Sequence, residues 1–204
     1  MKLPPEFYQR TNVIKIARDL LGKALFTNVN NMLTGGIIVE TEAYSWTERG
    51  CHAYQKRQTN RNAIMFEEGG FSYVYLCYGM HHLFNVVTNK KDVPEAILIR
   101  ALEPIQGESI MSERRPGITK PIQLTSGPGK LTKSLGIDRK LNGKSLLGNE
   151  VWIEDIGYKI ASRNIVAGPR IGIDYAGEDA LLPWRFFLKE NRWVSKMPTT
   201  GTSF

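Results

Sequence analysis

Alternating apolar and polar positions predict strands over much of the chain, and the clearest of them runs from Gly36 to Tyr44. Apolar β-branched residues lead there into alternating acidic and small residues, which is typical of a strand that begins in the core and ends at its rim. Because side chains alternate along a strand, Glu40 and Glu42 are expected on one face. Two carboxylates on one face repel each other, bind cations or carry out acid–base chemistry.

A second strand pattern, from Phe71 to Met80, is rich in aromatic residues. A glycine near its end permits a tight reversal into a third pattern, Leu83 to Val87. The resulting hairpin is expected to present Tyr78 and Met80 at an exposed tip, whereas Tyr73 is expected in the core.

A fourth strand pattern, from Ala96 to Leu102, places Arg100 on the same face as two leucines. An arginine among apolar neighbours requires a buried anion, because an unpaired buried charge costs several kcal/mol. The sequence therefore predicts a carboxylate partner for Arg100.

Two elements are expected before the strand of Glu42. Thr11-Asn12 can cap a helix that runs to about Leu21, and a strand from Lys23 to Val29 turns back through Asn30-Asn31. After the strand of Glu42, the polar segment from Thr47 to Asn62 shows no periodicity and predicts a long loop. Loops of this length within a compact domain tend to be functional.

Two helices are expected after Arg100, the first from Pro104 to about Arg114 and the second after Ser126, its expected cap. Backbone N–H groups at the start of the second helix, beside a lysine, form a phosphate-binding feature. The residues of this feature are Gly127, Gly129 and Lys130. Further short strands are expected at Val151–Glu154, Arg170–Ile173, Trp184–Leu188 and Arg192–Ser195.

These patterns predict an α+β fold with a curved, mainly antiparallel β-sheet and peripheral helices. At 204 residues the chain is expected to form a single domain, 1–204, that needs no cofactor. Its net charge of +7 suits a polyanionic partner, and the basic residues concentrate between Glu108 and Lys144.

The expected compartment follows from what the sequence lacks. No charged-then-apolar leader opens it and no apolar run approaches a membrane span, so a cytoplasmic or nucleoid-associated protein without a membrane partner is expected, or a nuclear one in a eukaryote. Cys51 and Cys77 are expected as free thiols in a reducing cytosol.

A series of short motifs follows in order along the chain: Val39–Tyr44, His52, Arg57–Thr59, Arg61–Asn62, Met65–Phe66, Tyr73–Tyr75, Tyr78–Met80, Asn85, Arg100–Pro104, Ser126–Pro128 and Lys130–Leu131. Together they resemble the alkyladenine (3-methyladenine) DNA glycosylase family. The resemblance implies an open, six-stranded, barrel-like fold related to the carboxy-terminal domain of formyltransferases. It also implies a monofunctional glycosylase, expected as a monomer, that removes damaged purines from double-stranded DNA. The substrates so implied are 3-methyladenine and, as further candidates, hypoxanthine and ethenoadenine.

The resemblance also implies roles for single residues. Glu42 is the base that activates water, and Arg100 is the partner of that water. Four residues form the base pocket, namely Tyr44, His52, Tyr75 and Asn85, the last as the amide that screens against guanine. Two side chains at the hairpin tip are inserted into the duplex, namely Tyr78 and Met80.

The chemistry of base removal agrees with these roles. A base inside a duplex has to be extruded, and a wedge residue then fills the gap. Aromatic faces hold the extruded purine, and a cationic alkylated purine stacks more strongly. Alkylation weakens the glycosidic bond, so one carboxylate that activates water suffices.

Four alternatives remain open from the residues alone. A glycoside hydrolase needs two carboxylates on opposite sides of a sugar, whereas Glu40 and Glu42 flank one side. A lyase needs an amine nucleophile, and no lysine is singled out. A non-catalytic DNA-binding module gains nothing from a carboxylate in its groove. A zinc site lacks a Cys-x-x-Cys or His-x-Glu signature, and its only candidate ligands are Cys51, His52, Cys77, His81 and His82.

Overall fold

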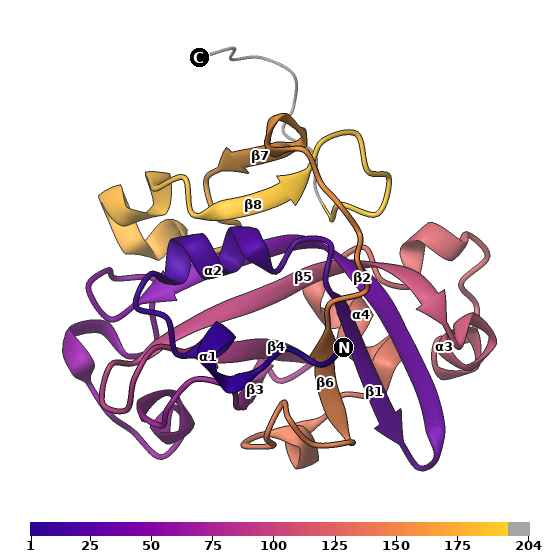
Figure 1. The fold of residues 1–204 in the computed structure, drawn as a ribbon, viewed down its shortest axis with the longest axis horizontal. Helices are drawn as coiled ribbons and strands as arrows, with labels where there is room; N and C mark the ends of the chain where they lie inside the picture. Colours follow the sequence, from indigo (N-terminus) through magenta and orange to yellow (C-terminus); the bar gives the residue numbers. More distant parts are fainter. Residues whose placement is uncertain (196–204) are drawn as a thin grey trace.

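The computed structural model describes residues 1–195, whose strands form one antiparallel sheet that does not close into a barrel (Figure 1). The strand order is β3-β4-β5-β2-β1-β6, and β8 pairs with both β2 and β7. The predicted α+β class is confirmed, although the described sheet has eight strands and the resemblance implied six. The strands are β1 (Ala24–Val29), β2 (Met32–Ser45), β3 (Ser72–Cys77), β4 (His81–Thr88), β5 (Glu95–Gln106), β6 (Val151–Glu154), β7 (Ile165–Gly168) and β8 (Arg185–Leu188).

Strand β2 is the centre of the sheet because it pairs with three other strands. Strand β5 pairs along one edge, while β1 and β8 share the other, with β8 opposite residues 40–42. The register against β5 shifts at Glu40, and a bulge of this kind re-aims the side chains of a strand. The part of β2 that carries the two carboxylates is therefore enclosed between β5 and β8.

Both predicted hairpins are present. Asn30 and Asn31 join β1 to β2 with φ angles of 55° and 60°, as a tight turn between twisted strands requires. Tyr78 and Gly79 lie in the turn between β3 and β4 with φ angles of 49° and 70°. Nothing lies within 4 Å of a Cβ built on Gly79, so this turn projects freely from the molecule.

The helices pack against the sheet and complete its core. They are α1 (Pro5–Tyr8), α2 (Val13–Asp19), α3 (Glu108–Arg114) and α4 (Pro128–Leu135). Helix α2 packs on β2 and β5, whereas α4 packs on β4 and β5 (Figure 1). The predicted cap of α2 is confirmed, because the Asn12 side chain accepts the N–H of Lys15 at 2.9 Å. Short 3-10 turns connect the other elements: η1 (Tyr54–Lys56), η2 (Ala63–Phe66), η3 (Pro121–Gln123), η4 (Arg139–Leu141), η5 (Ser162–Asn164) and η6 (Asp174–Leu181).

The predicted start of the first helix after Arg100 was wrong. Strand β5 continues through Pro104 to Gln106, and α3 begins only after Gly107, whose φ of 71° ends the strand. Pro104 is paired with β2 and has no strand on its other side, so its missing N–H removes no ladder bond.

Three further predictions were wrong. Ser126 does not cap α4: Gly127 is the cap residue, and Ser126 forms a β-bridge to Ala101. Residues 170–173 and 192–195 are not strands, and β7 takes their place in pairing with β8. These segments are held by side-chain hydrogen bonds rather than by a ladder, such as those of Arg170 to Glu48 and of Ser195 to Glu40.

Two other observations bear on the expected compartment. Cys51 and Cys77 are both free thiols, as predicted. Among the helices of residues 1–195, none combines the length and the apolar character that a membrane crossing requires.

Candidate active site

The two carboxylates of β2 and the arginine of β5 form one buried cluster. Arg100 Nε donates to Glu40 Oε1 at 3.0 Å, and Arg100 Nη1 lies 3.2 Å from Glu42 Oε1. Both glutamates are 0% exposed. Burial alone would lower the pKa of Arg100, but Glu42 and Glu40 raise it, so the guanidinium stays charged. The predicted buried anion of Arg100 is therefore a pair of carboxylates.

Glu40 is fully engaged in holding the sheet together. Its Oε1 also accepts from Arg185 Nε at 2.7 Å and from the Ser195 hydroxyl at 3.0 Å, and its Oε2 accepts the Ser195 N–H at 2.7 Å. Each oxygen thus bonds to Ser195, and Oε1 also bonds to Arg185 of β8, so Glu40 links β2 to these later residues. This arrangement suits a structural, charge-balancing role for Glu40.

Glu42 shares Arg100 with Glu40 but has two hydrogen-bond partners of its own. Its Oε1 accepts the Ile171 N–H at 2.8 Å, and its Oε2 accepts the Tyr44 hydroxyl at 2.8 Å. Burial and then the charge of Glu42 raise the pKa of Tyr44 well above its usual range, so the phenol keeps the proton it donates. Tyr44, Ile171 and Arg100 all line a cavity, so Glu42 lies one contact away from it.

That cavity has a volume of about 760 Å³, within the range of small-ligand sites. It opens between the β3–β4 hairpin, the start of α4 and the segment that precedes η6. Nine of the eleven predicted site residues line it: Tyr44, His52, Tyr75, Tyr78, Asn85, Arg100, Gly127, Gly129 and Lys130. Glu42 and Met80 do not line it.

Aromatic rings gather on one wall of the cavity. The His52 ring lies edge-on to the Tyr75 ring at 4.6 Å, and the Tyr73 and Tyr75 rings are 5.2 Å apart. His52 Nδ1 is 2.8 Å from the Tyr73 hydroxyl. Tyr73 is buried, as predicted, but it also lines the cavity and fixes His52. These rings offer flat apolar faces on which a purine can stack.

His52 is held in its neutral form. Burial and then the nearby charge of Arg61 lower its pKa from 6.5 to about 4. A neutral ring beside the cavity leaves room for a cationic ligand, which an imidazolium would repel.

This shift predicts a pH dependence of stability. The folded pKa of His52 lies below the unfolded value, so the unfolded chain binds more protons between about pH 6.5 and 4. Stability should therefore fall as the pH falls through this window, by up to about 1.4 kcal/mol per pH unit. Denaturant unfolding of His52→Gln should show a shallower fall than the wild type. The exposed His81 supplies the control, since His81→Gln should keep the wild-type slope, and equal slopes for all three proteins would contradict the burial of a neutral His52.

Asn85 lies on β4 with its amide fixed from behind. Its Nδ2 donates to the Tyr73 carbonyl oxygen at 3.1 Å, and Asn85 is 4% exposed. This bond orients the amide at the cavity wall, where it can interact with the edge of a bound base.

The hairpin tip carries the most exposed large side chains near the cavity. Tyr78 is 84% exposed and Met80 is 73% exposed. Of the two, Tyr78 lines the cavity and Met80 does not. Both residues are thus exposed, as predicted, but they differ in whether they border the cavity.

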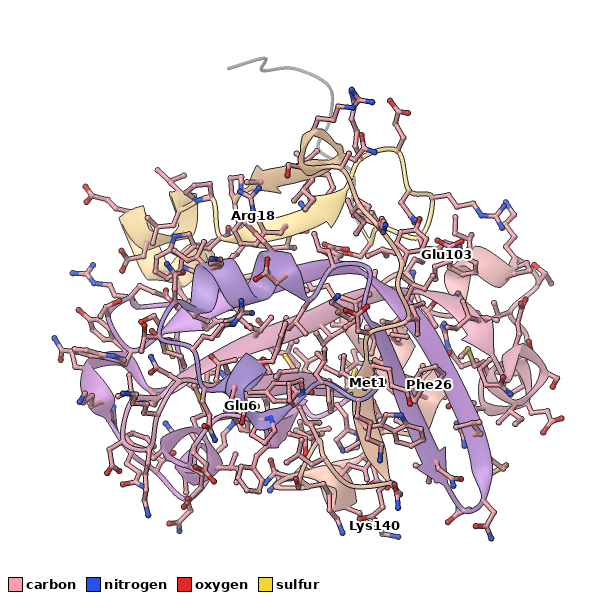
Figure 2. The ribbon with its side chains drawn as sticks, viewed as in Figure 1. Met1, Glu6, Arg18, Phe26, Glu103 and Lys140 are labelled. Carbon is pink, nitrogen blue, oxygen red and sulfur yellow. The ribbon has the colours of Figure 1, made fainter. Side chains whose placement is uncertain are left out.

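The start of α4 forms the opposite rim. Gly127, Gly129 and the exposed Lys130 line the cavity there. A Cβ on Gly129 would lie 2.9 Å from the His81 ring, so a glycine lets the helix start pack against β4. Lys140, farther along the basic segment, points outward at the periphery of the molecule (Figure 2). The residues predicted to bind phosphate and those predicted to hold a base therefore line the same cavity.

Sequence reasoning missed several cavity residues. Arg61, Ile171 and Tyr175 line the cavity, and Arg170 supports it from behind. The Arg61 guanidinium lies 4.8 Å from the centre of the Tyr75 ring. Arg61 belongs to the Arg61–Asn62 motif of the family resemblance and could have been predicted as a site residue. Nothing in the local sequence pattern marks Ile171 or Tyr175.

The cavity thus combines aromatic walls, a buried carboxylate–arginine cluster behind them and a basic rim. The family model described as methylpurine-DNA glycosylase matches residues 6–192. The chain belongs to this family and is a DNA glycosylase, a hydrolase of N-glycosyl bonds that serves DNA repair. The family resemblance and the enzyme class expected from the sequence are thereby confirmed.

Relatives from distant organisms match over nearly their whole length. A protein of Methanocella arvoryzae is 49% identical over 95% of this chain and 96% of its own. One of Carboxydothermus hydrogenoformans is 48% identical over 96% of this chain and 100% of its own. One of Chlamydia felis is 46% identical over 91% and 95%, respectively. Each bears the name "Putative 3-methyladenine DNA glycosylase".

Proposed function

We propose that this protein, acting as a monomer, flips 3-methyladenine and related alkylated purines out of duplex DNA and hydrolyses their N-glycosidic bond. The observation that carries the proposal is the contact of Glu42 with Tyr44 and Arg100, which places a buried carboxylate directly behind an aromatic cavity. The names of the relatives supply the substrate, 3-methyladenine. Hypoxanthine and ethenoadenine are further candidates for the same cavity.

The chemistry assigned to the cavity begins with the flipped base. The purine stacks between Tyr44 and the rings of His52 and Tyr75, and each aromatic stack contributes about 1 to 3 kcal/mol. Asn85 faces the edge of the base and disfavours guanine, whose exocyclic amine adds bulk and a donor. A cationic alkylpurine has a weakened glycosidic bond and strengthens the stack.

Glu42 then acts as the general base. A water oxygen bonds to C1′ of the sugar, Glu42 takes the water proton, and the electron pair of the glycosidic bond leaves with the purine, which neutralises its charge. Arg100, 3.2 Å from Glu42 Oε1, holds the water beside this carboxylate. No lysine has to attack the sugar, so the product strand keeps an intact abasic site.

The proposal is tested with duplex DNA that carries radiolabelled methyl groups on its purines. The expected products are free 3-methyladenine and a strand that breaks only after treatment with alkali. Strand breaks without alkali would contradict the monofunctional mechanism, and the absence of any released purine would contradict the proposed function. Duplexes with hypoxanthine or ethenoadenine, assayed alongside, rank the further substrates.

Lys130 is expected to contact DNA phosphate, because it lies beside the backbone N–H groups at the start of α4. Lys130→Ala should weaken the binding of lesion and undamaged duplexes about equally and reduce the slope of log K against log salt by about one. Binding is measured by fluorescence anisotropy at several salt concentrations. Lys189→Ala, at an exposed site remote from the cavity, is the control. A loss confined to lesion DNA would move Lys130 into the base pocket.

Tyr78 is expected to fill the gap that the flipped base leaves. Tyr78→Ala should slow the excision of paired lesions more than that of lesions in single strands or opposite an abasic site, where no gap needs filling. Tyr158, which is 45% exposed and does not line the cavity, supplies the control Tyr158→Ala. Equal losses on all substrates would show that Tyr78 does not act as a wedge.

A further inference from the structure

Arg170 is a buried arginine that none of the roles above employs. Its side chain is 0% exposed, and its two terminal nitrogens donate to Glu48 Oε1 and Oε2, each at 2.7 Å. The same nitrogens donate to the carbonyl oxygens of Ala43 and Asp179, both at 3.0 Å. Two parallel bonds to one carboxylate fix the plane of a guanidinium. Arg170 thereby ties together the end of β2, the loop after it and η6.

The guanidinium of Arg170 also lies on two aromatic rings. It is 4.8 Å from the centre of the Tyr44 ring and 5.2 Å from that of Trp184. A planar guanidinium stacks on such faces in a way that a lysine ammonium cannot. Tyr44, which we assign to the base pocket, is therefore supported by a cation held in one orientation.

The residue after Arg170 contacts Glu42 directly. The Ile171 N–H donates to Glu42 Oε1 at 2.8 Å, and Ile171 lines the cavity. Residues 169–173 belong to no strand, so no ladder fixes this N–H. The side-chain bonds of Arg170, to the Ala43 carbonyl oxygen of β2 and to Glu48 in the loop after it, hold the segment in place.

We propose that Arg170 is a positioning residue that sets two of the hydrogen bonds accepted by Glu42, those from the Tyr44 hydroxyl and the Ile171 N–H. The inference rests on the proposed function of Glu42 and extends it to the groups that aim this carboxylate. A carboxylate that loses such donors is protonated more readily. Loss of Arg170 therefore raises the pH at which catalysis fails on the acidic side.

The test is the pH profile of single-turnover base release from methylated duplex DNA by Arg170→Lys. The rate at pH 7 should fall by about 10- to 100-fold, as expected for small misplacements in an active site. The acidic limb of the profile should move to higher pH. Affinity for undamaged duplex should stay near that of the wild type, because Arg170 is buried away from the DNA-facing rim.

Two further variants separate positioning from stability. Ile153→Val, in the buried core of β6 and remote from the cavity, lowers stability without touching Glu42 and should keep the wild-type profile. Glu48→Gln leaves Arg170 in place but loosens its orientation, and should shift the acidic limb in the same direction by a smaller amount. If Arg170→Lys does not fold, Glu48→Gln alone provides the test.

The outcomes are distinct. An unchanged acidic limb in both Arg170→Lys and Glu48→Gln, assayed well below their unfolding temperatures, would overturn the positioning role and leave the proposed function intact. An inactive wild-type protein on methylated duplex DNA would contradict the proposed function and this inference together. A shifted limb in either variant, with Ile153→Val unchanged, supports the inference.

Discussion

Glu42→Gln should slow single-turnover base release by about 10²- to 10⁴-fold, the usual contribution of a general base. Glutamine keeps the shape of the side chain and an acceptor for Arg100, but it cannot take a proton from water. Lesion binding should persist, because the stacking residues Tyr44 and Tyr75 are untouched. Glu42 is fully buried, so any rate loss at this position reflects the cluster and not a surface charge.

Stability measurements on the same variant test the alternative that Glu42 serves only as the ion-pair partner of Arg100. If Glu42 served only to pair Arg100, the variant would lose folding stability in proportion to its loss of activity. Arg100 still contacts Glu40 in this variant, so its charge keeps a carboxylate partner. Near-normal base release by a folded Glu42→Gln protein would contradict the catalytic assignment.

Glu40→Gln should have the opposite effect: a large loss of folding stability and a small change in the rate of base release. This carboxylate receives Arg100, Arg185 and Ser195, so its neutralisation removes the anion shared by two buried arginines. Breaking a buried ion pair in this way typically costs about 3 to 5 kcal/mol. Urea or thermal unfolding should show a loss of this order. Base release at a temperature where the variant stays folded should change far less than in Glu42→Gln.

A surface ion pair supplies the control for Glu40. Arg10 and Asp19 lie 2.6 Å apart, but their side chains are 34% and 40% exposed. Asp19→Asn makes the same carboxylate-to-amide change and should alter stability by less than about 1 kcal/mol. Losses of equal size at Glu40 and Asp19 would show that the buried cluster contributes no more than a surface pair.

The carboxylate–arginine cluster could be predicted because two local rules point to it. The period of two in β2 places Glu40 and Glu42 on one face, and the cost of a buried charge demands a partner for Arg100. The structure brings the three residues together as expected. The tip of the β3–β4 hairpin was predictable for a similar reason, since a glycine beside aromatic residues marks a tight turn.

The environment of Arg170 could not be predicted from the local pattern. The alternation of isoleucines after it indicated a strand at 170–173, but its binding partner Glu48 lies 122 positions earlier in the chain. The hydrophobic periodicity of a short segment carries no information about a partner so far away in the sequence. The four-residue strand β7 was missed because a segment this short shows little alternation, and its pairing with β8 decides its structure.

The functional roles beyond the enzyme class depend on the two glutamates of β2, which sequence pattern alone treats alike. The structure distinguishes them by their partners: Glu40 contacts groups that close the fold, and Glu42 contacts Tyr44, a wall of the cavity. The distinction was invisible in the sequence because Arg185 and Ser195 lie about 150 residues downstream, 145 and 155 positions from Glu40.

The most direct test compares single-turnover release of 3-methyladenine by Glu42→Gln and Glu40→Gln on one methylated duplex, with enzyme in excess and both variants folded. The account predicts that Glu42→Gln binds the duplex but releases base at least about 100-fold more slowly than the wild type. Glu40→Gln should release base at a rate much closer to that of the wild type. Normal release by Glu42→Gln, or a selective chemical defect in Glu40→Gln alone, would contradict the assignment of Glu42 as the base that activates water.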